Sequence, residues 1–218
     1  HPVFVYIPPN GELRGGAWVV VDPTINPAKM EMYADKESRG GILEPPGICE
    51  VKYRKPDQLA TAHRLDPVLR ELDAELASAV DDDESDRIVA EISSRERLIA
   101  PSYLQVAHEF ADLHDRSGRM KAKGVIRDEL DWASSREYLY WRIRRRLLED
   151  NVKERIMASG LSEEEAASRI SDGMGAASAS DRDAVAWLVA NAAAADDMVN
   201  AARVDTAAAA VRSLLDGL

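Results

Sequence analysis

The first 55 residues place short apolar runs between turns, which is the pattern of β-strands. Val3–Ile7 is apolar at every position and ends at residues 8–11, Pro-Pro-Asn-Gly. Trp18–Val21 repeats this arrangement and ends at Asp22-Pro23. Each run therefore predicts a short strand covered on both faces.

Three further elements are expected in the same part of the chain. Met30–Ala34 predicts a short helix, and Gly40–Gly47 predicts a turn-rich segment around a short strand. The stretch Glu50–Arg54 alternates, so Lys52 and Arg54 are expected on one face of a strand.

From residue 56 onward the apolar positions recur at helical spacing. Asp66-Pro67 predicts a helix N-cap followed by proline at the first helical position. The acidic residues 81–85 predict a solvated turn between two antiparallel helices, and Pro101 predicts a break or kink. The apolar stripes of these helices are Leu65, Leu69, Leu72 and Leu76; Ile88, Ile92, Leu98 and Ile99; and Val106, Phe110 and Leu113.

A third helix is expected over about 134–149, and an alanine-rich helical segment follows it. Ser162 and Glu165 form a capping box, and Ser180 precedes a similar helix start. The expected buried line of the 134–149 helix is Leu139, Ile143 and Leu147.

These patterns divide the chain into three parts and indicate the α/β class. Residues 1–55 form a β-rich core, and 56–150 a helical hairpin with an arginine-rich helix. Residues 151–218 form an alanine-rich helical tail.

Composition excludes some classes of function. The net charge of −11 argues against nucleic-acid binding, which requires a basic domain. Runs such as Ala17–Val21 are too short to span a membrane. The single cysteine, Cys49, cannot form an internal disulfide and is expected to be a buried apolar residue. A chain of 218 residues that begins with His1 instead of Met suggests a processed or excised piece.

Two polar clusters invite a chemical role and favour a structural one. His108 and His114 lie six apart, so they do not share a helix face, and no metal is expected. The dense basic run, which is Arg136, Arg142, Arg144, Arg145 and Arg146, is expected to pair with the many carboxylates. A weaker alternative is that some of these arginines meet an anionic ligand or an acidic partner surface.

Two sites remain as candidates for chemistry, each with a structural alternative. Gly15-Gly16 allows a sharp turn whose N–H groups stabilise an oxyanion, or it is simply a tight loop between core strands. Lys52 and Arg54 are expected on one strand face, where one interpretation is that they bind phosphates or a carboxylate. The other is that their charges protect an edge strand from pairing with another chain. No GxSxG, P-loop or GxGxxG pattern in its strand–turn–helix context is present in the sequence.

Six longer strings resemble, in order and spacing, the carboxyltransferase domain of eukaryotic multidomain acetyl-CoA carboxylases. They are VFVYIPPNGELRGGAWVVVDPTINP, MEMYAD, ILEP, VKYR, FADLHDRSGRMKAKGVI and LDWASSREYLYWRIRRRL. Together they cover roughly residues 2–150, while 151–218 carry no recognisable motif.

The resemblance implies a fold and an activity. The fold is crotonase-like (ClpP/crotonase), built of β-β-α units, and this chain corresponds to a half-domain truncated at its N-terminus, with a long helical hairpin and a helical C-terminal tail. The activity transfers a carboxyl group from carboxybiotin to acetyl-CoA, giving malonyl-CoA for fatty acid biosynthesis. The ATP-using biotin carboxylase and the biotin carrier domain lie elsewhere, and no metal is implied in this chain.

The resemblance also implies site residues and partners. Arg14, Gly15 and Gly16 shape a turn near the biotin pocket, and Lys52 and Arg54 serve the CoA side. The dimer-interface cavity is lined by Trp18, Val19, Val20, Ile42 and Glu44. A complete site requires the N-half of the domain and a homodimer, so the chain by itself is expected to be inactive.

Two other functions stay open from the sequence. One is carboxylation of another acyl-CoA, such as propionyl-CoA. The other is a catalytically inert dimerisation or scaffold module, because most of the chain is helical and far in sequence from the candidate site. The expected location is the cytoplasm, with a plastid as the alternative.

Overall fold

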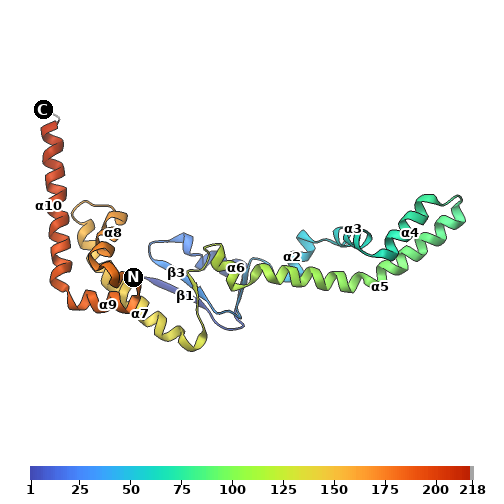
Figure 1. The fold of residues 1–218 in the computed structure, drawn as a ribbon, viewed down its shortest axis with the longest axis horizontal. Coiled ribbons are helices and arrows are strands. Elements are labelled where there is room, and N and C mark those ends of the chain that lie inside the picture. The colour runs from blue at the N-terminus through green and yellow to red at the C-terminus, as the bar shows by residue number, and fades with distance from the viewer. Residues whose placement is uncertain (217–218) are drawn as a thin grey trace. The chain divides into compact units, whose positions relative to one another are not determined.

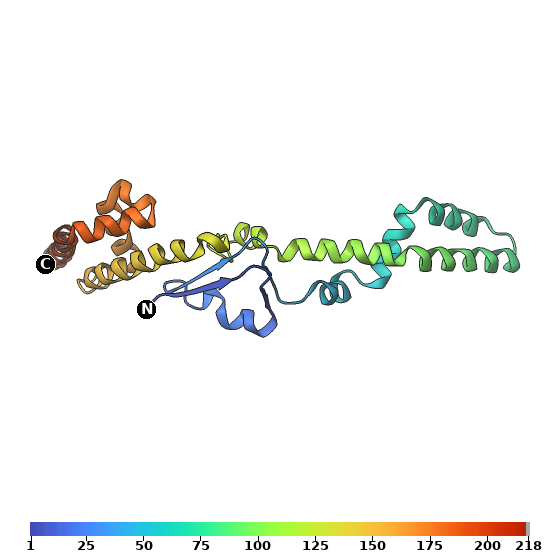
Figure 2. The same cartoon turned by 90° about the horizontal axis from the view of Figure 1, so that it is seen from below.

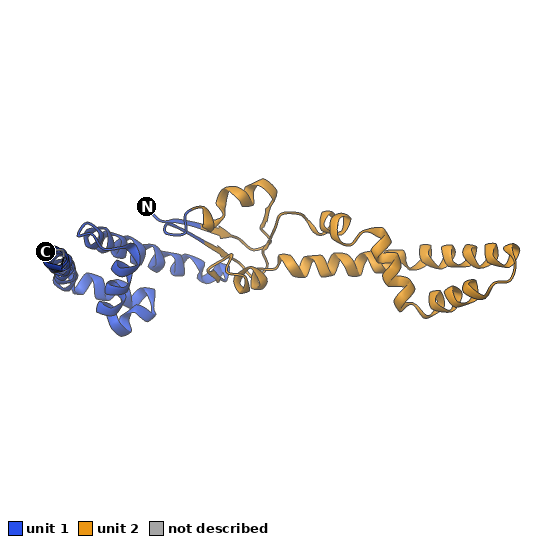
Figure 3. Cartoon of the chain, turned by 90° about the horizontal axis from the view of Figure 1, so that it is seen from above, with its two compact units in different colours: residues 1–4, 26–31, 130–218 blue, residues 5–25, 32–129 orange. Residues whose placement is uncertain are grey.

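The computed structural model describes residues 1–216, which form two compact units (Figure 3). Unit 1 contains residues 1–4, 26–31 and 130–218, of which 217 and 218 lie outside the described part. Unit 2 contains residues 5–25 and 32–129. Each unit is described by itself.

Two small sheets organise the N-terminal part (Figure 1). The first has the order β1-β3-β5, with β1 at Val3–Ile7, β3 at Met30–Ala34 and β5 at Asp128–Glu129. The second pairs β2 (Glu12–Arg14) with β4 (Arg39–Gly41) in parallel, and Arg14 lies opposite Gly41. Two helices follow these two strands: α1 (Gly15–Val21) and α2 (Pro45–Lys52).

A helical hairpin makes up the middle of unit 2, and it is the teal and green part of Figure 2. The elements are α3 (Lys55–Leu65), α4 (Pro67–Ser78), α5 (Asp82–Asp115) and α6 (Ser117–Ala122). The predicted antiparallel pair is confirmed, because α4 packs along α5 and both Asp66 and Asp81 cap helices as N-caps. Its core consists of Ala62, Leu69, Leu72, Ile88 and Ile92.

Unit 1 is helical after β5 and has a core of its own. Its elements are α7 (Trp132–Met157), α8 (Glu163–Met174), α9 (Asp181–Ala190) and α10 (Ala192–Asp216). Short 3₁₀ turns occur at Gly175–Ala179 in this unit and at Pro23–Ile25 earlier in the chain. The predicted capping box of Ser162 and Glu165 is confirmed, as is the cap at Ser180. The core includes Ile156, Ala166, Ile170, Ala184 and Val199, all at most 2% exposed.

Two predicted elements near the sheets are wrong, and tertiary contacts explain both. Trp18–Val21 belongs to helix α1 and not to a strand, because Gly15 takes a φ of +52° and ends β2 at Arg14. Met30–Ala34 is strand β3 and not a helix, because its backbone pairs within the three-stranded sheet and four of its five residues are buried. Local propensity yields to pairing and burial here.

The predicted strand at Glu50–Arg54 is also wrong. Residues Pro45–Lys52 form α2, which two prolines in its first turn initiate. Lys52 is the last residue of α2, and Arg54 is the N-cap of α3. The two side chains therefore lie on different elements and do not share a strand face.

Three details of the helices differ from the predicted ones. Pro101 lies inside α5, which continues through it, and the acidic stretch from Asp82 is the first turn of that helix, not a loop. On α7 the predicted buried line is wrong, because Ile143 is 37% and Leu147 is 46% exposed. The buried positions of α7 are Ser135, Arg142, Asp150, Val152 and Ile156. Of the hairpin stripes, Leu65, Leu98, Val106, Phe110 and Leu113 are exposed.

Candidate functional site

The parallel pairing of β2 with β4 brings the two main candidate segments together. Arg14 ends β2 opposite Gly41, so residues 14–20 continue beside residues 42–44. The Gly15 N–H donates to the Ile42 carbonyl oxygen at 3.0 Å. We call residues 14–20 and 42–44 the β2–β4 corner. All of the residues predicted for the biotin side and the interface cavity lie in it.

The Arg14 side chain holds the corner in place. Its guanidinium donates to the Asp115 carboxylate, to the Leu43 carbonyl oxygen at 3.1 Å and to Glu12 at 3.0 Å. Burial alone would lower the pKa of Arg14, but the hydrogen bonds to Asp115 and Glu12 outweigh it and raise the pKa. The charged guanidinium of Arg14 is therefore bonded to residues of this chain, and these bonds hold the β2–β4 corner in position.

The two glycines of the corner have different roles. Gly15 needs its left-handed φ of +52°, which disfavours any residue with a Cβ, and its N–H is already bonded to Ile42. Gly16 borders open space, since an added Cβ would meet no heavy atom within 4 Å. Its N–H belongs to the first turn of α1, where no acceptor exists within the helix. Of the two amides, only that of Gly15 is bonded to the carbonyl oxygen of Ile42.

The corner exposes apolar side chains while one aromatic residue anchors it. Val19, Val20 and Ile42 are 67%, 72% and 69% exposed. Trp18 packs instead against the core of unit 2 that contains Met32 and Met120. Glu44, the N-cap of α2, is exposed and makes no side-chain cap hydrogen bond. The corner is thus a fixed backbone turn beneath an exposed apolar surface.

The two residues predicted for CoA binding lie at the ends of two successive helices. Arg54 lines a cavity of about 840 Å³ between α2, α3 and α5, and Lys52 is not among the residues that line it. Cys49 is 3% exposed, which confirms its predicted burial, and desolvation raises the pKa of its thiol.

Sequence reasoning missed the residues that fix the corner from α5. Asp115 lies 101 positions from Arg14 in sequence, and Asp112 receives the Arg39 guanidinium at 2.7 Å. The pairing with Arg39, aided by Arg116, lowers the pKa of Asp112 despite its partial burial. No local pattern marks either aspartate. The glycine at position 40 is the one feature of the sequence that hints at close packing here. A Cβ at Gly40 would lie within 2.7 Å of atoms of Met120 and Trp18.

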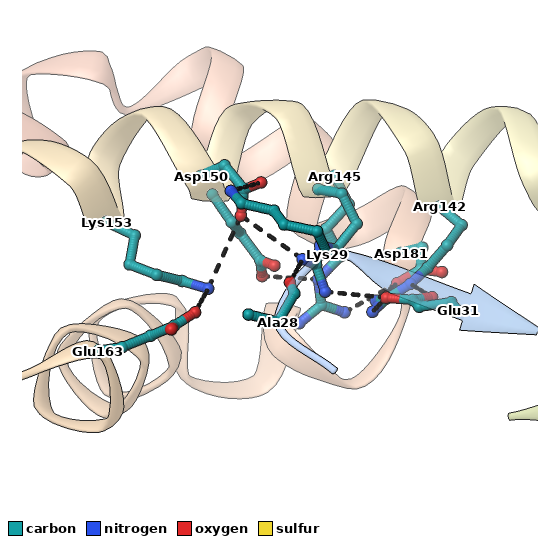
Figure 4. A network of polar contacts seen from close by, with 11 residues as sticks. Ala28, Lys29, Glu31, Arg142, Arg145, Asp150, Lys153, Glu163 and Asp181 are labelled. Atoms are coloured by element: carbon teal, nitrogen blue, oxygen red, sulfur yellow. Dashed lines mark hydrogen bonds and ion pairs between the residues drawn. The ribbon is translucent and has the colours of Figure 1, made fainter. Parts of the chain in front are cut away.

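The arginine-rich run is a structural network in unit 1 (Figure 4). Arg142 donates to both oxygens of buried Glu31, at 2.9 and 2.6 Å, and Arg145 donates to Asp181 at 3.0 Å. Lys29 donates to Asp150 at 2.8 Å; this bond and the neighbouring cations lower the pKa of Asp150 although burial opposes the shift. The predicted pairing with carboxylates is confirmed for Arg142, Arg145 and Arg146.

Residues 1–216 contain neither a candidate metal site nor a candidate membrane span. No group of three or more His, Cys, Asp or Glu side chains there could hold a metal ion. His114 instead contacts the Phe110 carbonyl oxygen through Nδ1 at 2.9 Å. No helix in this part of the chain is both long and apolar enough to cross a membrane.

Comparison with known proteins gives a family match over most of the chain. Residues 1–147 match the family model described as the carboxyl transferase domain. The chain is 53% identical over 140 residues to the mitochondrial acetyl-CoA carboxylase of Saccharomyces cerevisiae, and the match covers 64% of the chain. It is 53% identical over 142 residues, or 63% of the chain, to the acetyl-CoA carboxylase of Dictyostelium discoideum. In both cases the match spans about 6% of the relative's length.

Proposed function

We propose that this chain, which belongs to the carboxyl transferase domain family, supplies part of the site that transfers a carboxyl group from carboxybiotin to acetyl-CoA. The product is malonyl-CoA, and the reaction belongs to fatty acid biosynthesis. The observation that carries the proposal is the β2–β4 corner, where the Gly16 amide and open space lie beside an exposed apolar surface.

The corner suits the chemistry of this transfer. Carboxybiotin and the acetyl thioester both pass through enolate-like states whose negative charge develops on oxygen. Fixed N–H donors stabilise such charge because they need no reorganisation during the reaction. We assign this role to the Gly16 amide, and we assign to Arg14 the positioning of the turn through Asp115 and Leu43.

The exposed apolar residues suit a partner surface. Val19, Val20 and Ile42 leave a cluster of side chains that water solvates poorly. We propose that the N-half of the domain in a second subunit covers them, with Trp18 and Glu44 at the edge of the shared cavity. The biotin arm of a separate carrier domain enters this cavity as a co-substrate. The acyl-CoA is bound jointly with that N-half, and Arg54 is the residue of this chain proposed to meet it.

Reconstitution tests the proposed function. The chain is mixed with a polypeptide that carries the rest of the carboxyl transferase domain, and decarboxylation of malonyl-CoA that depends on a biotin analogue is measured. We expect activity in the mixture and none in either part alone. A well-folded mixture without activity would contradict the proposal and favour a scaffold role.

A matched pair of glycine variants tests the corner. Gly16→Leu fills open space without a clash, so the fold is expected to persist while activity falls at least 10-fold. Gly118→Leu is the control, because Gly118 is also exposed and is also the second residue of a short helix. Equal activity of the two variants would remove Gly16 from the site.

A further inference from the structure

Helix α10 has two apolar faces, and only one of them is buried in unit 1. The buried face carries Ala195, Val199 and Ala202, which belong to the core of that unit. The second face lies about half a turn away around the helix, and its large side chains are between 55% and 71% exposed. They are Val204, Val211, Leu214 and Leu215. Water solvates such a face poorly, so it is a candidate contact surface.

The spacing of the second face is that of a helix that pairs with another helix. Val204 and Val211 lie seven positions apart, and so do Ala207 and Leu214. In a heptad the two valines occupy a positions, and Ala207 and Leu214 occupy d positions. We call this face, together with the adjacent e positions, the α10 stripe. It consists of residues 204, 207, 208, 211, 214 and 215.

The charges of α10 indicate the kind of partner that fits the stripe. The α10 stripe contains no charged residue, and the polar Asp197 and Asn200 occupy the a and d positions that precede it. The charged residues Asp205, Arg212 and Asp216 lie on another side of the helix at 3.6 residues per turn. The stripe therefore matches a second apolar heptad stripe and does not match a charged surface.

The α10 stripe is complementary to itself when two copies run antiparallel. Each a residue of one helix then faces a d residue of the other. Val204 lies opposite Leu214 of the second copy, and Ala207 lies opposite Val211 of the second copy. Every layer thus contains a smaller and a larger side chain, whereas a parallel pair would place Ala207 against its own counterpart and leave a gap. The antiparallel arrangement also places opposite ends of the two helix dipoles together.

We propose that α10 joins two copies of this chain through an antiparallel helix pair in which the two α10 stripes face each other. The alanines at 207, 208 and 210 allow the helices to approach closely. The stripe spans only two heptads, so the interface is small and the association is weak and depends on concentration. The proposal does not rest on the proposed function, because α10 lies beyond residues 1–147, which match the family model.

Sedimentation velocity of the full chain over a range of concentrations tests the association. We expect a fraction of dimer that rises with concentration. Val211→Glu should raise the dissociation constant at least 10-fold, because the new carboxylate must lose its water at the interface. Ala209→Glu is the matched control, since it adds the same carboxylate at an exposed position of α10 outside the stripe. This variant should associate as the unmodified chain does.

Disulfide trapping tests the orientation of the two copies. A mixture of A207C and V211C chains should form a cross-linked dimer several-fold faster than either variant alone, because positions 207 and 211 face each other only between antiparallel copies. A mixture of A209C and V211C chains should cross-link no faster than its separate components. The native Cys49 is buried, and the unmodified chain is the blank.

Three results would overturn the proposal. The first is equal association of the Val211→Glu and unmodified chains. The second is efficient cross-linking of A207C with itself, which would indicate a parallel pair. The third is a chain that stays monomeric and is not cross-linked at any concentration, which would assign the α10 stripe to a different partner. The reconstitution assay of carboxyl transfer bears on none of these results.

Discussion

At the scale of single residues, buried charges hold this protein in place more than they perform chemistry. Asp115 is 4% exposed and receives the Arg14 guanidinium, which in turn fixes Leu43. Because a buried charge without its partner is costly, each member of this pair depends on the other. The consequence is that the backbone of the corner is set from α5.

Replacing Asp115 should therefore destabilise the protein strongly. Asp115→Asn keeps the shape but removes the charge that balances Arg14, and we expect a loss of roughly 3 kcal/mol in the free energy of unfolding. The control is Glu91→Gln on the same helix, whose pair with Arg87 is exposed and should change stability by less than about 1 kcal/mol. Urea unfolding followed by circular dichroism measures both. Equal losses would show that the Arg14 pair is not structural.

His63 predicts a pH dependence of the hairpin. Its Nε2 lies 2.9 Å from Glu96 and its Nδ1 2.7 Å from Asp73, and these hydrogen bonds, that of Glu96 first, raise the pKa of His63 from its ordinary value of 6.5. A raised folded-state pKa adds stability that is complete below the unfolded-state value and is lost as the pH rises through the folded-state value.

The urea midpoint of unit 2 should therefore fall as the pH rises from about 6.5 through the raised folded-state pKa of His63. His63→Gln should flatten this part of the profile, because the imidazolium that joins α3 to α4 and α5 is gone. His108→Gln, which changes a histidine outside this contact, should keep the unmodified slope. A profile of His63→Gln that still falls as steeply would assign the dependence to another group.

At the scale of elements, pairing and burial decide structure where local preference points elsewhere. The capped helix starts at Asp66 and Ser162 are visible in the sequence because a cap acts through residues three positions away. Met30–Ala34 lies between two partners in the sheet, and one of them, Asp128–Glu129, is about 100 residues further on and only two residues long, so no local pattern marks the pairing. Turn and cap signals are local, whereas sheet pairing is not.

The same contrast holds for the candidate site. The Gly15-Gly16 turn was predictable because a left-handed φ requires glycine. The placement of Lys52 and Arg54 on two different helices was not predictable, because an apparent alternation over five residues is too short to separate a strand from the end of a helix. Asp115 could not be found at all, because its role depends on a contact across 101 positions.

Pro101 makes a prediction for helix α5. The proline lacks an N–H, so the carbonyl of Arg97 has no donor four residues later within the helix. Pro101→Ala should restore this hydrogen bond and raise the free energy of unfolding by roughly 1 to 3 kcal/mol. Ser102→Ala, at the next exposed position, should change it by less than about 0.5 kcal/mol. A destabilised Pro101→Ala would mean that the helix depends on the proline for its path.

Helix α7 makes a second prediction at this scale. Arg142 is 5% exposed and donates to both carboxylate oxygens of Glu31. The arginine-rich part of α7 therefore contributes to the packing of unit 1. Arg142→Gln should cost roughly 3 to 5 kcal/mol in the free energy of unfolding, because Glu31 stays buried without its main partner. Arg136→Gln, at an exposed position of the same helix, should be nearly neutral. Denaturation followed by near-ultraviolet circular dichroism distinguishes them, and two neutral variants would contradict the network.

At the scale of the whole molecule, apolar side chains form buried cores, but some also remain exposed on the surface. Each unit buries its own apolar cluster, yet the corner leaves Val19, Val20 and Ile42 largely exposed. The family relatives are far longer, since the match covers about 6% of them. The proposed function makes these exposed apolar residues one side of an interface with the N-half of the domain.

This explanation predicts a selective effect on assembly. Val20→Glu places a charge on a side chain that is 72% exposed, so the chain alone should keep its stability within about 0.5 kcal/mol. Association with the complementary part of the domain should weaken at least 10-fold, because the new carboxylate must lose its water at the interface. Val80→Glu is the control, since Val80 is 92% exposed between α4 and α5, away from the corner in the chain. Analytical ultracentrifugation of the mixtures measures the association. If both variants associate equally well, the corner does not contact the partner, and its apolar residues need another role.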